Sequence, residues 1–150
     1  MMSLSKKCQY AVRATFELAK RAGQGPTPIA EIAAAQVIPP RFLEVILNQL
    51  RQAGFVRSQR GAQGGYMLQG DPQALSVGQI IRFVDGSLAP VKCVMEAGEK
   101  DCPMYGRCPF LRMWERARDA VEGVYDKTTF ANLLAEEAAT AQCRSADFNI

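Results

Sequence analysis

A tight break between two short helical segments constrains the fold of this chain more than any other feature. Thr27 can cap a first helix that Pro28 opens, and residues 36–39 interrupt that helix. Pro40 then opens a second helix that runs to Ala53. The apolar stripe of the second helix falls at positions i, i+3, i+4 and i+7, namely Leu43, Ile46, Leu47 and Leu50. Two short helices joined by a tight turn predict a helix-turn-helix.

A glycine-rich segment follows this pair of helices. Gly54 ends the second helix, and residues 55–58 and 66–68 have the composition of two short strands. The loop between the strands, residues 59–65, contains three glycines and favours a hairpin. A basic hairpin after a helix-turn-helix predicts a winged helix-turn-helix with a two-stranded wing.

Helical patterns dominate the rest of the chain, so the expected fold class is mainly α. Residues 8–22 read as one helix, and a capping box from Ser76 to Gln79 opens another. We expect four segments: the winged helix-turn-helix domain (1–86), a cysteine-containing loop (87–108), a long helix with a terminal helix (109–141) and a tail (142–150).

The helix predicted from residue 109 to about residue 125 is long, amphipathic and short of partners. Its apolar stripe comprises Leu111, Trp114, Ala117, Val121 and Tyr125. Only one further helix follows it, at about residues 129–141. A long amphipathic helix outside a compact domain is often a dimerisation arm, and we therefore expect a homodimer. The alternative is that this helix packs back onto its own domain.

The charge of the chain is small but unevenly distributed. The 150 residues carry a net charge of +3, while residues 1–70 hold nine Lys/Arg against three Glu, net +6. A basic first half suggests an anionic partner, with double-stranded DNA the first expectation, although a solvated basic face would give the same pattern. The sequence shows no apolar run of membrane-spanning length and no secretory signal, so we expect a cytoplasmic protein without a membrane partner.

Histidine is absent, which removes the commonest general base and the His-ligated metal sites. The sequence also shows no phosphate-binding loop and no evident catalytic pair, so we expect no enzymatic activity. Five cysteines are present: Cys8, Cys93, Cys102, Cys108 and Cys143. An odd number of cysteines in a cytoplasmic chain argues against a disulfide framework and favours metal, cluster or redox chemistry.

The second helix of the pair is expected to enter the major groove of DNA. Its outward side chains are Arg41, Glu44, Val45 and Asn48. Arg can bind guanine or phosphate, Glu can accept a hydrogen bond from cytosine, and Asn can pair with adenine. The other candidates are Arg57, Arg60, Gly64 and Gly65 in the wing, and Lys6, Lys7 and Arg13 for phosphate contacts. The alternative is an ordinary solvated helix face.

Cys93, Cys102 and Cys108 lie in one irregular segment with the spacing C-x8-C-x5-C. Thiolates select zinc or iron–sulfur clusters. Structural zinc usually has four Cys or His ligands, and no fourth lies nearby in the sequence. We therefore favour an iron–sulfur cluster, either 2Fe–2S or 4Fe–4S, with free thiols or an incidental disulfide as the alternatives.

Several motifs together resemble the Rrf-type family of winged-helix transcription regulators, the IscR-, NsrR- and CymR-like proteins. They are Tyr10-Ala11-Val12-Arg13-Ala14, Phe42-Leu43-Glu44, Leu50-Arg51-Gln52-Ala53-Gly54, Arg60-Gly61-Ala62-Gln63-Gly64-Gly65-Tyr66, Asp85-Gly86, and the three cysteines before a long helix. The resemblance runs from about Leu4 to Leu134. It implies a homodimer on a palindromic promoter operator, a recognition helix carrying Glu44, a wing that brings Arg60 into the minor groove, and a cluster on the three cysteines.

The chain departs from the cluster-bearing members of that family in the spacing of its cysteines and in the residue available as a fourth ligand. The first cysteine interval is longer than in well-known members, and the histidine of IscR-like members is missing. Other members take a carboxylate from the partner's first helix, at the position that Gln9 occupies here. Cys8, one residue earlier, is therefore a candidate fourth ligand, and equally a candidate buried hydrophobe. Glu96, Glu99 and Asp101 are alternatives within the loop.

These observations predict a sequence-specific transcription regulator that acts as a repressor. Its cluster would report iron–sulfur status, redox state or nitric oxide. One rival keeps the DNA-binding fold and uses the cysteines as a thiol switch or a zinc site. The other is an iron–sulfur carrier that does not bind DNA.

Overall fold

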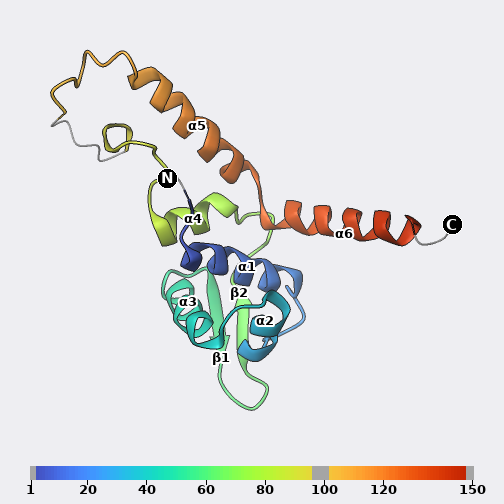
Figure 1. The fold of residues 1–150 in the computed structure, drawn as a ribbon. Coiled ribbons are helices and arrows are strands. Elements are labelled where there is room, and N and C mark those ends of the chain that lie inside the picture. The colour runs from blue at the N-terminus through green and yellow to red at the C-terminus, as the bar shows by residue number, and fades with distance from the viewer. Residues whose placement is uncertain (1–2, 96–101, 148–150) are drawn as a thin grey trace.

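Three helices and a hairpin form the winged helix-turn-helix unit (Figure 1). The computed structural model describes residues 3–95 and 102–147. The unit comprises α1 (Lys6–Lys20), α2 (Ile29–Gln36), α3 (Pro40–Gln52), β1 (Val56–Gln59) and β2 (Gly65–Leu68). Its core is filled by fully buried side chains from these elements, among them Leu18, Ile32, Leu43, Leu47, Leu50 and Val56. The predicted fold class, mainly α with a two-stranded wing, is confirmed.

The wing is tied to the segment between α1 and α2 as well as to itself. Strands β1 and β2 pair antiparallel, with Val56 opposite Leu68 and Gln59 opposite Gly65. Thr27 and Tyr66 exchange two backbone hydrogen bonds of 2.9 Å, so the α1–α2 segment adds a short third edge to the hairpin.

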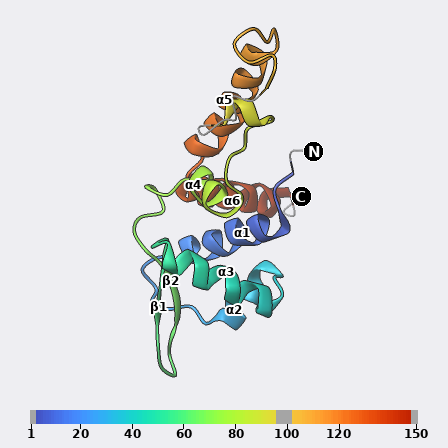
Figure 2. The same ribbon diagram turned by 90° about the vertical axis from the view of Figure 1, so that its left-hand side faces the viewer.

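The C-terminal part of the chain is helical and begins with a helix that packs on α1. It comprises α4 (Val77–Asp85), the 3-10 turn η1 (Lys92–Val94), α5 (Leu111–Lys127) and α6 (Phe130–Asp147). The predicted capping box opens α4, because Ser76 and Gln79 exchange side-chain to backbone hydrogen bonds. Figures 1 and 2 place α5 at one end of the molecule and the hairpin tip at the other.

Two contacts anchor α5 and α6 to the preceding part of the chain. Phe130, at the start of α6, is completely buried, and its N–H donates to the Leu75 carbonyl at 3.1 Å. Arg82 of α4 forms an ion pair with Asp126 near the end of α5. A Cβ atom on Gly78 would collide with the Asp126 carboxylate, so glycine permits this close approach of α4 and α5.

Several predicted boundaries were wrong. Helix α1 begins at Lys6 rather than residue 8, because the Ser5 hydroxyl accepts a hydrogen bond from the Cys8 N–H at 3.0 Å. Pro28, not Thr27, is the N-cap of α2. The predicted tail from residue 142 is helical as far as Asp147, since α6 continues through it. Within residues 3–95 and 102–147, no helix is long and apolar enough to cross a membrane.

Candidate nucleic-acid interface and cysteine loop

Helix α3 turns one face to the core and the other to solvent. Leu43, Leu47 and Leu50 are completely buried, which sets the rotation of the helix about its axis. The outward side chains of its N-terminal half are those that the sequence indicated: Arg41, Glu44 and Val45, all exposed, and Asn48, partly buried. These side chains are therefore available to the edges of base pairs.

The wing arginines are also exposed. Arg57 lies on β1 opposite Met67, and Arg60 follows the last residue of β1. The structure gives Gly64 a role inside the wing, because a Cβ atom on it would collide with the Gln59 carbonyl oxygen. The wing loop therefore requires glycine for its own fold, whatever it contacts.

A groove of about 470 Å³ separates α3 from the wing. Its polar lining consists of Asn48, Arg51, Ser58, Gln59 and Arg60, and the first turn of α2 borders it. No side chain caps the N-terminus of α2, so its first N–H groups and the positive end of its dipole remain available there. Two guanidinium groups beside a helix N-terminus suit a phosphate.

The sequence-based list of contacts missed three of these groove residues, Arg51, Ser58 and Gln59. A signal for two of them was present. Arg51 stands three residues after Asn48 on the same helix, which places both on one face. Ser58 stands two residues before Arg60 on the strand side of the wing, and alternate strand residues share a face.

The three basic residues of α1 that the sequence indicated lie in different environments. Lys6 and Lys7 are exposed in the first turn of α1. Lys7 lines a shallow pocket with Gln52 and Phe83, at the C-terminal end of α3 rather than at its outward N-terminal half. Arg13 is engaged within the fold, because its guanidinium donates to the Gln36 carbonyl oxygen and lies 6.0 Å from the Tyr10 ring centroid. Arg13 therefore caps the C-terminus of α2, which weighs against a phosphate contact.

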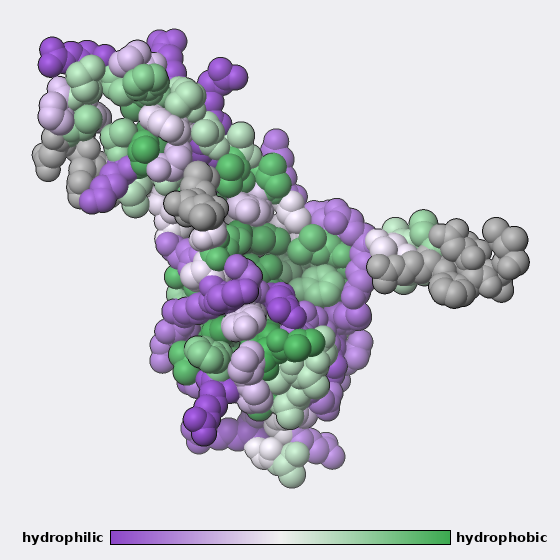
Figure 3. Space-filling view, in the orientation of Figure 1, coloured by the Kyte–Doolittle hydropathy of each residue, from purple (hydrophilic) through white to green (hydrophobic). Residues whose placement is uncertain are grey.

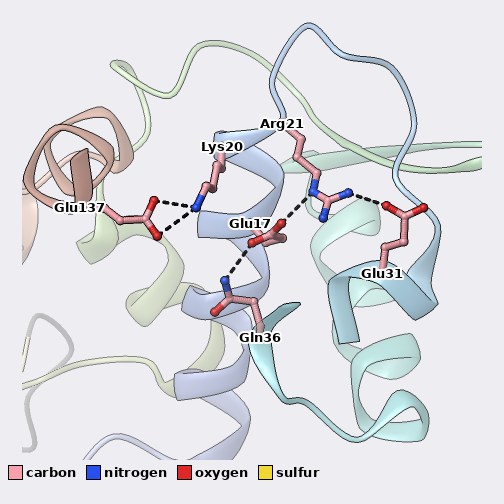
Figure 4. Close-up of polar contacts among 6 residues, drawn as sticks. All are labelled: Glu17, Lys20, Arg21, Glu31, Gln36 and Glu137. Atoms are coloured by element: carbon pink, nitrogen blue, oxygen red, sulfur yellow. Dashed lines mark hydrogen bonds and ion pairs between the residues drawn. The ribbon is translucent and has the colours of Figure 1, made fainter. Parts of the chain in front are cut away.

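A polar network around buried Glu17 holds α2 against α1 (Figure 4). Glu17 accepts a hydrogen bond from Arg21 at 2.7 Å and one from Gln36 at 2.9 Å. Arg21 also pairs with Glu31 at 2.6 Å, so the network reaches both the first and the last turn of α2. Burial alone would raise the pKa of Glu17, but the hydrogen bonds from Gln36 and Arg21 outweigh burial and lower that pKa.

A separate ion pair in Figure 4 joins α1 to α6. Lys20 Nζ lies 2.8 Å from the Glu137 carboxylate, and both side chains are about half exposed. Exposed pairs of this kind contribute little to stability. The buried Phe130 is therefore the main anchor of α6 on the winged unit.

The three loop cysteines lie between α4 and α5. Cys93 sits in η1 and Cys108 just before α5, both partly buried, and Cys102 is exposed. The Arg118 guanidinium of α5 donates to the Val94 carbonyl at 2.6 Å and holds η1 against that helix. Among the residues that the structure describes, no three His, Cys, Asp or Glu side chains form a metal-holding group. The alternative ligands Glu96, Glu99 and Asp101 lie outside the described residues.

Cys8 is packed in the core instead of facing a partner. Its side chain is completely buried. Burial and the neighbouring Asp85 carboxylate raise the pKa of the Cys8 thiol to about 12. Because iron and zinc bind the thiolate form, this environment disfavours Cys8 as a fourth ligand and favours its interpretation as a small buried hydrophobe.

Helix α5 keeps an open apolar face. None of its residues is buried in the single chain, and Met113 and Val124 are 48% and 63% exposed. Phe110, which precedes the helix, is 58% exposed. In Figure 3, apolar residues line the visible surface of α5 and its junction with α4. The face is suited to burial against a second helix of the same kind.

Comparisons with known proteins agree with this architecture. The family model Rrf2, described as an iron-dependent transcriptional regulator, matches residues 4–136. The transcriptional regulator CymR of Bacillus subtilis is 41% identical over 133 residues, covering 88% of this chain and 89% of the relative. The regulator IscR of Photobacterium profundum is 35% identical and covers 89% of this chain and 76% of the relative.

Solved structures show the same relationship. CymR of B. subtilis, described as a global cysteine regulator, superposes with a TM-score of 0.76 at 38% identity, covering 91% of this chain and 98% of that one. The oxidised form of Staphylococcus aureus CymR gives a TM-score of 0.67 at 35% identity, covering 87% and 94%. With the family model spanning most of the sequence and the winged fold shared, the chain belongs to the Rrf2 family of transcriptional regulators.

Proposed function

We propose that the protein is a homodimeric, sequence-specific DNA-binding regulator that represses transcription from a palindromic promoter operator. One observation carries the proposal. The exposed face of α3 and the basic loop of the wing border the same groove, which is lined by Arg51 and Arg60. Both elements lie at the end of the molecule opposite α5 (Figure 1), so DNA can approach them without meeting the C-terminal helices.

Each group at this end of the molecule has a chemical part in the proposed complex. Arg41, Glu44 and Asn48 are placed to read base edges in the major groove. Arg60 is placed to enter the minor groove, where its charge meets a concentrated negative potential. Arg51 and the N-terminus of α2 suit a backbone phosphate in the groove between α3 and the wing.

Dimerisation through α5 completes the proposed operator contact. Two recognition helices in successive major grooves stand about 34 Å apart, so their spacing must be held by a rigid element. The open apolar face of α5 supplies such a contact when paired with a second copy. A two-fold dimer of this kind reads a palindrome.

Cys93, Cys102 and Cys108 are proposed to form the sensing site of the regulator. An iron–sulfur cluster, when bound, supplies a thiolate-ligated redox centre whose state follows iron–sulfur supply, oxidants or nitric oxide. Three thiols suit that group chemically, although the described residues do not bring them together. The Arg118 bond to Val94 joins the loop to α5, so a change in the loop reaches the dimer helix and through it the spacing of the recognition helices.

A thiol switch is the second candidate for the input. It is supported by the accessibility of the loop cysteines and by the relative whose solved structure is an oxidised form. The two candidates share the DNA-binding function and differ only in what the cysteines do. Iron and sulfide analysis of an anaerobic preparation separates them, because a thiol switch contains neither iron nor inorganic sulfide.

Selection from a random-sequence duplex library tests the DNA-binding proposal. The full chain should enrich one palindromic sequence, and a gel shift with that duplex should weaken strongly for Arg60→Ala. Arg112→Ala, which removes the same charge from the exposed surface of α5 at the opposite end of the molecule, is the matched control and should bind as the wild type does. No enriched sequence, or equal binding by Arg60→Ala, would contradict the proposal.

A further inference from the structure

Three apolar side chains stand out on the surface that is proposed to face DNA. Val37 in the turn between α2 and α3 is 79% exposed, Phe42 in the first turn of α3 is 64% exposed, and Val45 one turn later is 55% exposed. Single exposed apolar side chains are common on protein surfaces and need no explanation. Three of them within nine residues, in and just before the proposed recognition helix, do need one.

The backbone of Val37 gives a second and independent indication. Its φ of 50° and ψ of 54° lie in the left-handed region, and it is the one non-glycine residue among those described with positive φ. Left-handed backbone is unfavourable for a β-branched residue, whereas glycine adopts it freely. The Val37 side chain is largely exposed, and the next residue, Ile38, is the one that is buried. The fold therefore gains little from a side chain at Val37, and a strained residue of this kind points to a function.

Helical spacing places the other two side chains together. Phe42 and Val45 are three residues apart, so they neighbour each other on one face of α3. Arg41 and Glu44, the proposed base-reading residues, alternate with them along the same exposed half of the helix. The apolar groups are therefore continuous with the proposed base-reading face.

In the major groove, the C5-methyl of thymine is the apolar group that distinguishes one base pair from another. We infer that Val37, Phe42 and Val45 form an apolar surface that reads thymine methyl groups in each half-site. The inference rests on the proposed function and adds a base preference to it. A protein partner is disfavoured for this surface, because charged side chains interrupt it, while the apolar face suited to a second copy lies on α5 at the opposite end of the molecule.

Replacing thymine by deoxyuridine removes only the methyl group and so tests the inference directly. The probe is the duplex enriched by the full chain from the random library, with each thymine replaced in turn. Uridine at one or more positions per half-site should weaken binding about fourfold for each buried methyl. Val45→Ala and Phe42→Ala should bind the thymine and uridine duplexes at those positions almost equally.

Arg60→Ala provides the matched control, because it should lower affinity for both duplexes and leave the thymine-to-uridine ratio as in the wild type. Val37→Gly should fold at least as well as the wild type and still lose discrimination at one position, so a folding defect cannot explain its result. If an enriched duplex binds equally well with uridine at every thymine, the methyl-reading inference is wrong while the DNA-binding proposal stands. If no duplex is enriched, the proposed function fails and the inference fails with it.

Discussion

Gly65 lies so close to the backbone of Thr27 that a Cβ atom on it would collide with the Thr27 carbonyl oxygen. The next residue, Tyr66, exchanges both of its backbone hydrogen bonds with Thr27. The wing is therefore fixed to the segment that leads into α2. Its position relative to the recognition helix depends on this backbone contact together with the buried side chains of Val56 and Leu68.

Gly65→Ala is expected to displace the wing from this segment. The added methyl group meets backbone atoms that cannot move aside, and overpacking of this kind costs roughly 1–3 kcal/mol. Chemical denaturation should show the loss, and affinity for the selected duplex should fall with it. Gln63→Ala, in the same loop but exposed, should leave the stability unchanged. Wild-type stability and binding in Gly65→Ala would show that the Thr27 contact is dispensable.

Arg60→Ala and Glu44→Ala are expected to weaken DNA binding by different routes. Arg60 acts through charge, so its loss should lower affinity for all sequences and reduce the dependence of log Kd on log salt by about one. Glu44 acts through base choice, so its loss should relax specificity at one position per half-site, worth roughly 1–3 kcal/mol. Fluorescence anisotropy across salt concentrations and base substitutions checks both. Unchanged salt slope and base preference in both variants would disprove the docking arrangement.

Val121→Glu is expected to break the dimer. Val121 lies on the apolar stripe of α5, and an unpaired carboxylate in an apolar interface is costly. Sedimentation at micromolar concentration should show monomer or aggregate. Arg112→Glu introduces a carboxylate on the charged, exposed side of α5, away from the face of Met113 and Val124, and should remain dimeric. A stable Val121→Glu dimer would move the interface away from this stripe.

Acid is expected to lower the stability of the fold by protonating Glu17. Burial raises the pKa of Glu17, but the Gln36 and Arg21 hydrogen bonds lower it to a value below the ordinary 4.5. A group whose folded pKa lies below its unfolded pKa stabilises the fold above the unfolded value and loses that contribution as pH falls through the folded one. Denaturation between pH 7 and pH 3 should therefore show that the free energy of unfolding falls below about pH 4.5. This fall should be smaller in Glu17→Gln. An identical pH profile in that variant would assign the acid loss to other carboxylates.

Serine substitutions should separate the loop cysteines from Cys8. If an iron–sulfur cluster is bound, Cys93→Ser, Cys102→Ser and Cys108→Ser should each abolish or weaken the visible absorption of the anaerobic protein. Cys8→Ser should leave the spectrum intact and lower stability, because Cys8 is buried and its thiol pKa is about 12. A changed spectrum in Cys8→Ser would restore Cys8 as a ligand. Stoichiometric zinc without iron or sulfide in the wild type would exclude the cluster and leave the DNA-binding assignment untouched.

Local features of the fold could be predicted from the sequence because they depend on neighbouring residues. The stripe of Leu43, Leu47 and Leu50 predicted which face of α3 is buried and therefore which side chains face outward. The Ser76 capping box and the glycine-rich hairpin were also predicted correctly. The extension of α6 to Asp147 was missed, because the mostly polar residues 142–147 carry no apolar stripe that would indicate a helix.

The tertiary structure alone decided the roles that depend on distant segments. Arg13 has the charge of a phosphate contact, yet the fold brings the Gln36 carbonyl to it across 23 residues. Cys8 has the chemistry of a ligand, yet packing buries it beside Asp85. The groove between Arg51 and Arg60 exists only because α3 and the wing meet. Residue type and spacing determine what a side chain can do, whereas burial and the nearest partner determine whether it is free to do it, and these depend on how the whole chain packs.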